Sequence, residues 1–140
     1  MHDLPDNNGG VGLHLFIDIH GVKPEPLMNL EFIKEMMVKA CQATGANVLS
    51  VHGHSFGEGM GVTSVVVLSE SHGSIHTWPE KNLAVMDFFT CGTCNPRLAI
   101  PVLFEALDPE VDAVVDLIYR GVPPMRYDVL RRPILPGVQG

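Results

Sequence analysis

Apolar and polar residues alternate along the first ordered stretch of the chain. Between Val11 and His20, every second residue from Leu13 to Ile19 is aliphatic, and mostly polar residues fill the positions between. A period of two is typical of a half-buried β-strand. Similar apolar runs, bounded by glycine, proline or polar residues, predict five further strands, over residues 47–55, 62–70, 72–79, 83–91 and 110–120.

Two segments have the apolar spacing of a helix instead. Between Leu27 and Thr44 the apolar residues recur every three or four positions, with Asn29 as the expected N-cap and Gly45 as the expected C-cap glycine. Residues 95–107 predict a second helix, which begins with a capping asparagine and a proline. Pro101 should kink this helix or limit it to a few turns.

The order of these elements is one strand, one helix, four strands, one helix and one strand. Strands joined as hairpins, with helices between them, indicate an α+β two-layer sandwich: a mainly antiparallel sheet with two helices on one face. The run "TSVVVL" is apolar enough to be covered on both faces, so we expect a second copy of the chain to pack there and form a homodimer. Residues 1–140 should form one domain, with irregular tails over 1–10 and 121–140.

Composition and charge limit the partners. The formal net charge is -7 and basic runs are missing, which argues against nucleic acid and anionic membranes. No apolar stretch approaches the roughly 20 residues of a membrane helix, and the first ten residues lack the features of a secretory signal. We therefore expect a cytoplasmic protein whose three cysteines are reduced.

Residues whose side chains can act as acids, bases or nucleophiles gather in the stretch "LSESHGSIHTWPE", from Leu68 to Glu80. Ordinary interpretations remain open: Glu70 and Ser71 could be a strand end, His76 a solvated residue beside a buried Ile75, and Cys91 a small buried hydrophobe. Another alternative is a non-catalytic metal-binding domain, because zinc has suitable ligands in Cys91 and Cys94 of "CGTC" and in His52 and His54 of "HGH".

The run "GVTSVVVLSESHGSIHTWPE", followed by "DFFTCG", resembles the short prokaryotic S-adenosylmethionine decarboxylases, which are pyruvoyl enzymes made as self-cleaving proenzymes. The similarity extends from about Leu13 to Arg120. It implies that the bond between Glu70 and Ser71 breaks, giving a β chain of residues 1–70 and an α chain of residues 71–140. The Ser71 hydroxyl would attack the Glu70 carbonyl, and β-elimination of the ester followed by hydrolysis would leave a pyruvoyl group derived from Ser71.

The resemblance also implies roles for other residues. His76 would transfer protons during processing, with Thr63 assisting. The substrate would form a Schiff base with the pyruvoyl group, and Cys91 would return a proton to the substrate after the loss of CO2. Glu80 would bind the ribose hydroxyls and Phe56 would stack on adenine. Glu70 would help to position the site, while Asp87 is explained as an ionic or hydrogen-bond partner. No metal is implied.

The residues leave two questions open, the identity of the substrate and the geometry between Ser71 and His76. Relatives with the same processing residues act on arginine or ornithine, so the small amino-acid-type substrate is S-adenosylmethionine, for spermidine biosynthesis, or one of these two. Ser71 and His76 are five positions apart and would point to opposite faces of one ideal strand. We therefore expect a break between them, with Gly73 giving the backbone freedom.

Overall fold

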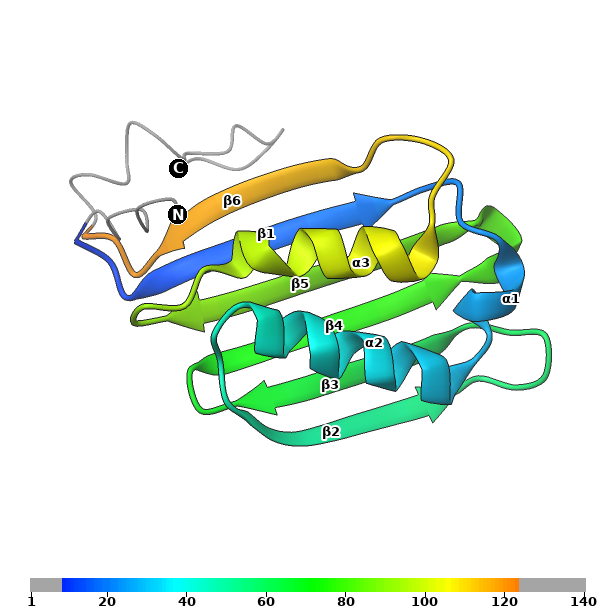
Figure 1. Cartoon of the computed structure of the whole chain (residues 1–140), viewed down its shortest axis with the longest axis horizontal. Coiled ribbons are helices and arrows are strands. Elements are labelled where there is room, and N and C mark those ends of the chain that lie inside the picture. Colours follow the sequence, from blue (N-terminus) through cyan, green and yellow to red (C-terminus); the bar gives the residue numbers. More distant parts are fainter. Residues whose placement is uncertain (1–8, 124–140) are drawn as a thin grey trace, which may run out of the picture.

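The structure is a computed structural model that describes residues 9–123 (Figure 1). Residues 1–8 and 124–140, which include most of both expected tails, lie outside the described residues. The strands are β1 (Gly12–Ile19), β2 (Val48–Ser55), β3 (Val62–Leu68), β4 (Ser71–Trp78), β5 (Leu83–Cys91) and β6 (Val114–Arg120). The helices are α1 (Pro24–Leu27), α2 (Leu30–Ala43) and α3 (Ala99–Leu107), with 3-10 turns η1 (Pro79–Lys81) and η2 (Pro96–Leu98).

The six strands form one sheet in the order β2-β3-β4-β5-β1-β6, and every neighbouring pair is antiparallel. Helices α2 and α3 both lie across the same face of this sheet (Figure 1). The prediction of an α+β two-layer sandwich is therefore confirmed. The order places β1 between β5 and β6, although β1 is the first strand of the chain.

The hydrophobic core lies between the helices and the sheet. Leu15, Ile17 and Phe88 from the strands and Ile33 and Met37 from α2 are fully buried there. The opposite face, here called the open face, carries the alternate residues of each strand.

The single chain covers only one face of the run "TSVVVL", so the expected cover on the other face by a second copy stays a prediction. Burial in β3 alternates, and Val65 and Val67 are 40% and 37% exposed on the open face. The reason is that both packed helices lie on the other face of the sheet. These exposed β-branched residues remain available for packing against another surface.

The structure agrees with most of the predicted helix boundaries. The side chain of Asn29 caps α2 by accepting a hydrogen bond from the Phe32 amide, and Gly45 follows with a φ of +94°. The second predicted helix is divided, because the segment begins as η2 before it becomes α3. Pro101 lies in the first turn of α3, where its missing N–H is not needed, so it does not break the helix. The short helix α1 was not predicted.

Within residues 9–123, none of the helices is both long and apolar enough to span a membrane.

Gly73 in β4 allows close packing of the sheet on α2. A Cβ atom at this position would lie 2.8 Å from the Cys41 Sγ atom and 3.1 Å from the Phe88 ring. The φ of Gly73 is not positive, so the position needs a small side chain rather than glycine's backbone freedom. The expected role of Gly73 as a flexible break is therefore corrected to that of a packing residue.

We expect Gly73→Ala to lower the free energy of unfolding by about 1–3 kcal/mol, since the added methyl group overpacks this contact. Urea titration of the variant and the wild-type protein measures the loss. Adding Cys41→Ala removes the Sγ atom, so the double variant should lose less than the sum of the two single changes. Strict additivity of the three values would contradict the proposed clash.

Candidate active site

The site begins at the turn between β3 and β4, which contains Ser69 and Glu70. Ser71 follows this turn with a φ of 138°, a region that residues other than glycine rarely adopt. Such a conformation stores on the order of 1–3 kcal/mol. The backbone strain that self-cleavage needs is thus located at the residue that follows the Glu70–Ser71 bond.

The Glu70 side chain fixes one side of this turn. Its two carboxylate oxygens accept hydrogen bonds from the Asn47 amide (2.9 Å) and the Asn47 side chain (3.1 Å), and the Ser69 amide donates to the Asn47 carbonyl (3.0 Å). Hydrogen bonds from Ser69 and from Asn47 lower the pKa of Glu70. The residue before the bond that is expected to break is therefore held as an anchored carboxylate.

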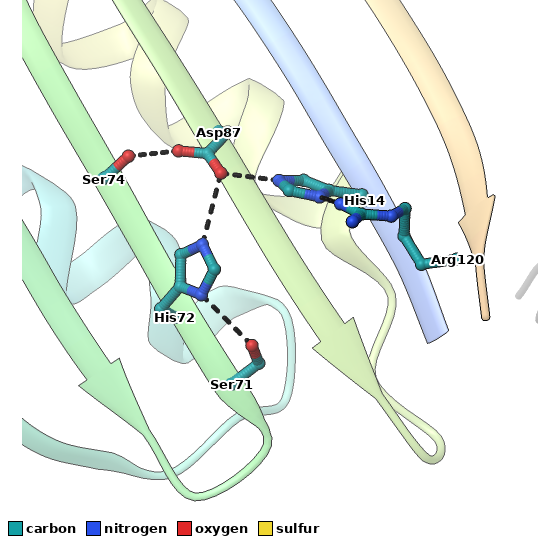
Figure 2. Close-up of polar contacts among 6 residues, drawn as sticks. All are labelled: His14, Ser71, His72, Ser74, Asp87 and Arg120. Carbon is teal, nitrogen blue, oxygen red and sulfur yellow. Dashed lines mark hydrogen bonds and ion pairs between the residues drawn. The ribbon is translucent and has the colours of Figure 1, made fainter. Parts of the chain in front are cut away.

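A chain of polar contacts runs across the open face from Ser71 (Figure 2). The Ser71 Oγ atom lies 3.2 Å from His72 Nδ1, and His72 Nε2 lies 3.3 Å from Asp87 Oδ2. The same Asp87 oxygen lies 2.5 Å from His14 Nε2, and the other accepts a hydrogen bond from Ser74. Three side chains, one from β1 and two from β4, thus meet around the Asp87 carboxylate in the middle of β5.

Burial and charge set the ionisation of this cluster. Burial opposes the ionisation of Asp87, but the hydrogen bonds from Ser74 and His14 outweigh it and hold the pKa of Asp87 below its usual value. Burial also lowers the pKa of His14, although the neighbouring Asp87 acts in the opposite direction. The His14 ring is stacked between Phe16 and Phe89, with centroid distances of 4.2 and 5.1 Å. The cluster therefore favours an ionised aspartate and a neutral His14.

Cys91 lies beside the turn at the end of β5. Its neighbour Thr90 pairs with Ser71, and Cys91 is half-buried, so it is not the fully buried hydrophobe of the ordinary interpretation. Cys94 is buried, and burial together with the nearby charge of Glu70 raises its pKa. The first group of site residues therefore consists of Glu70, Ser71 and Cys91.

A second group lies at the other end of β4. His76 packs between the rings of Phe56 and Trp78, with centroid distances of 5.5 and 4.4 Å. Together with Glu80 these side chains line a hollow of about 320 Å³. The hydroxyl of Thr63, the cross-strand neighbour of His76, donates to the Ile75 carbonyl at 3.1 Å.

The structure separates these two groups within one chain. Ser71 and His76 are five positions apart in one continuous strand, which corresponds to a distance of about 16 Å. The expected break in the strand is found at Ser71 itself, as its positive φ shows, and not at Gly73. His76 therefore does not reach Ser71 of the same chain.

The zinc alternative has no support from the positions of its four residues. His52 and His54 lie on the edge strand β2, whereas Cys91 ends β5, and β3 and β4 separate these strands. Among residues 9–123, the side chains close enough to share a metal are His14, His72 and Asp87. This group contains none of the four proposed ligands.

Comparison with known proteins identifies the family. Residues 13–121 match the model of the S-adenosylmethionine decarboxylase family. The chain belongs to this family. Three relatives described as S-adenosylmethionine decarboxylase proenzyme come from Thermodesulfovibrio yellowstonii (40% identical, covering 76% of this chain and 79% of the relative), Brevibacillus brevis (46%, 71% and 74%) and Methanococcus maripaludis (43%, 80% and 91%).

A solved structure agrees with this assignment. The adenosylmethionine decarboxylase of Aquifex aeolicus superimposes with a TM-score of 0.72 at 32% identity, covering 81% of this chain and 93% of that protein. The resemblance drawn from "ESHGSIHTWPE" is thus confirmed at the level of family and fold.

The sequence interpretation missed the cluster of His14, His72 and Asp87 as a unit. Asp87 was explained only as a polar partner, and neither histidine was given a role. One signal was present: Asp87 is the only charged residue in the apolar strand "LAVMDFFTC", and a carboxylate in such a strand needs a polar partner.

Proposed function

We propose that the chain is a self-cleaving, pyruvoyl-dependent S-adenosylmethionine decarboxylase that cuts itself between Glu70 and Ser71. The observation that carries this proposal is Ser71 itself, a serine with a φ of 138° at the start of β4 whose hydroxyl contacts an imidazole nitrogen. Strain and an activated hydroxyl at one residue are what an attack on the preceding carbonyl requires. The product, decarboxylated S-adenosylmethionine, would serve spermidine synthesis.

The residues around Ser71 fit a pyruvoyl group formed there. The carbonyls of this group supply an electron sink for the loss of CO2 from an amino acid. Cys91, whose neighbour Thr90 pairs with Ser71, would hold the proton that returns to the substrate; this proximity supports the role. The anchored Glu70 carboxylate keeps the end of the first chain beside the site after cleavage.

The hollow lined by Phe56, His76 and Glu80 suits the nucleoside part of the substrate. Aromatic rings provide a stacking surface for adenine, and a carboxylate accepts hydrogen bonds from two ribose hydroxyls. Small-molecule sites have volumes of roughly 300–1,000 Å³, and the hollow, at about 320 Å³, is at the lower end of this range. An arginine or ornithine substrate would leave the stacking surface unused.

We further propose that two chains form a homodimer through their open faces. The separation of Ser71 from His76 supports this, because one chain does not complete the site. In a two-fold dimer, each contact occurs twice. The group of Glu70, Ser71 and Cys91 would then meet the partner's counterparts of His76, Phe56 and Glu80, while exposed Val65 and Val67 become buried.

The free thiols of the chain, Cys41, Cys91 and Cys94, are compatible with a reducing compartment, which we propose to be the cytoplasm.

Release of labelled CO2 from S-adenosylmethionine, arginine and ornithine, each carrying a labelled carboxyl group, tests the substrate. We expect release from S-adenosylmethionine alone. Release from arginine or ornithine, with none from S-adenosylmethionine, would contradict the proposed substrate but leave self-cleavage intact.

Glu80→Gln should weaken substrate binding without affecting self-cleavage. Loss of a charged hydrogen-bond acceptor removes about 1.5–3 kcal/mol, which corresponds to a rise in KM of about tenfold to a hundredfold. Steady-state decarboxylation of S-adenosylmethionine measures KM and kcat. Glu58→Gln, in the exposed turn after β2, is the matched control and should leave KM unchanged. An unaltered KM in the Glu80 variant would exclude its role in ribose binding.

A further inference from the structure

Apart from the contact between His72 and the Ser71 hydroxyl, the cluster around Asp87 has no role in the function proposed so far. It contains two histidines and a carboxylate that lie within 4.8 Å of one another, which raises the possibilities of a cation site and of a proton-transfer chain. The hydrogen-bonding capacity of each side chain distinguishes between them. Arginine has only donors, an ionised carboxylate has only acceptors, and a neutral imidazole has one of each.

Arg120 fixes the tautomer of His14. The guanidinium Nη1 atom of Arg120 donates to His14 Nδ1 at 2.7 Å, so this nitrogen is the acceptor of the ring. The proton of neutral His14 is then on Nε2, which donates to Asp87 Oδ2 at 2.5 Å. A nitrogen that carries this proton has no lone pair for a metal, and the adjacent guanidinium repels cations. The contacts therefore favour the proton-transfer chain.

Asp87 in turn fixes the tautomer of His72. As an ionised carboxylate, Asp87 can only accept, so His72 Nε2 donates to it across 3.3 Å. The lone pair of neutral His72 is then on Nδ1, which faces the Ser71 hydroxyl at 3.2 Å. Nucleophile, base and orienting carboxylate thus follow one another within hydrogen-bond reach (Figure 2).

The strain at Ser71 contributes to this arrangement. By strand alternation Ser71 would point to the helix-covered face, opposite to His72. Instead, Ser71 has a φ of 138°, and its hydroxyl contacts the His72 ring. The strained backbone is therefore associated with the contact between the nucleophile and its base.

We propose that His72 is the general base of the first step of self-cleavage, accepting the Ser71 hydroxyl proton at Nδ1. This inference rests on the proposed self-cleavage and adds to it a base from the same chain. Asp87 is a positioning residue, which holds His72 in the productive tautomer and stabilises the imidazolium. His14, whose ring is fixed by Arg120, holds Asp87 in turn.

The step balances without any added reactant. As the Ser71 oxygen attacks the Glu70 carbonyl carbon, its proton passes to His72 Nδ1 and the carbonyl oxygen takes the negative charge. When the C–N bond breaks, His72 returns that proton to the Ser71 nitrogen, which leaves an ester at the serine oxygen and a free amine. His72 ends neutral, and the later removal of the Ser71 α-proton is left to the partner's counterpart of His76.

The variants His72→Ala and His76→Ala separate the two steps. Hydroxylamine cleaves an ester but leaves the amide precursor intact, so it reports whether the first step has occurred. We expect His76→Ala to accumulate the ester and to split when hydroxylamine is added. We expect His72→Ala to remain intact with hydroxylamine, with the first step slowed by about 100-fold or more.

Two further variants distinguish the loss of the base from a loss of the fold. His72→Gln keeps a polar side chain and should be as slow as His72→Ala, while added imidazole should restore cleavage to His72→Ala. Asp87→Asn permits the wrong His72 tautomer, so it should slow the first step by about tenfold or more without responding to imidazole. His20→Ala, at an exposed position after β1, is the control and should cleave at the wild-type rate.

The outcomes distinguish this inference from the proposed function. If the wild-type protein is never cleaved, the proposed function fails, and this inference fails with it. If the wild-type protein is cleaved and His72→Ala is cleaved at a rate within threefold of it, only the role of His72 is overturned. Accumulation of the hydroxylamine-sensitive ester in His72→Ala would also overturn it, because His72 would then act after the first step.

Discussion

A Ser71→Ala variant should remain one chain of 140 residues under conditions in which the wild-type protein is expected to divide into two chains of 70 residues. Alanine has no oxygen to attack the Glu70 carbonyl, so neither the ester nor the pyruvoyl group can form. We expect a complete loss of cleavage and, with it, of CO2 release from S-adenosylmethionine. No other change in the protein should have a larger effect on activity.

Intact mass spectrometry measures this result. In the wild-type protein, the fragment that begins at position 71 should be lighter by one ammonia than the same peptide with an N-terminal serine. Ser69→Ala is the control, because Ser69 lies in the same turn and precedes the scissile bond by one residue; this variant should still divide. Cleavage of Ser71→Ala at the same bond would show that the nucleophile is elsewhere.

Mixed dimers of Ser71→Ala and His76→Ala should recover cleavage that neither variant shows alone. In the proposed dimer, the His76→Ala chain keeps its own Ser71 and receives an intact imidazole from its partner. Random pairing at a one-to-one ratio gives about half of the His76→Ala chains such a partner, so cleavage should rise from none to about half of these chains. Co-expression with two different affinity tags, followed by mass spectrometry, measures the fraction for each chain.

The same experiment contains its own control. The Ser71→Ala chains should stay uncut in every mixture, since they lack the nucleophile. Co-expressing Ser71→Ala with a Ser71→Ala, His76→Ala double variant should give no cleavage at all. If mixed dimers form and the His76→Ala chains remain uncut in them, the histidine acts within its own chain, and the shared site is excluded.

The sequence was most informative where the physical signal is local. Period-two alternation located β1 to within one residue at each end, and the asparagine before Leu30 marked the start of α2 correctly. Short-range signals failed where packing decides the outcome. Gly73 was interpreted as a flexible point, whereas the Sγ atom of Cys41, on a helix 32 residues away in the chain, explains it.

The site residues also fall into those that a local pattern reveals and those that only the fold brings together. The expected cleavage site and His76 lie within one short run of sequence, so a motif can find them. His14 and Asp87 are 73 residues apart, and they meet only because β1 pairs with β5. That pairing depends on the order of strands in the whole sheet, which no local pattern contains. The positive φ of Ser71 is likewise a property of the folded turn, since serine has no preference for it.

The position of β1 between β5 and β6 has a consequence for the life of the mature protein. If the chain divides between Glu70 and Ser71 as proposed, β1 belongs to one polypeptide and both of its neighbours belong to the other. The two polypeptides are interleaved, and separating them means withdrawing an interior strand with the hydrogen bonds on both of its edges. We therefore expect dissociation of the cleaved form to require unfolding of the sheet, and reassembly from separated pieces to depend on concentration. The uncut precursor should refold as a single chain, whereas the cleaved enzyme should owe its persistence to a slow rate of unfolding.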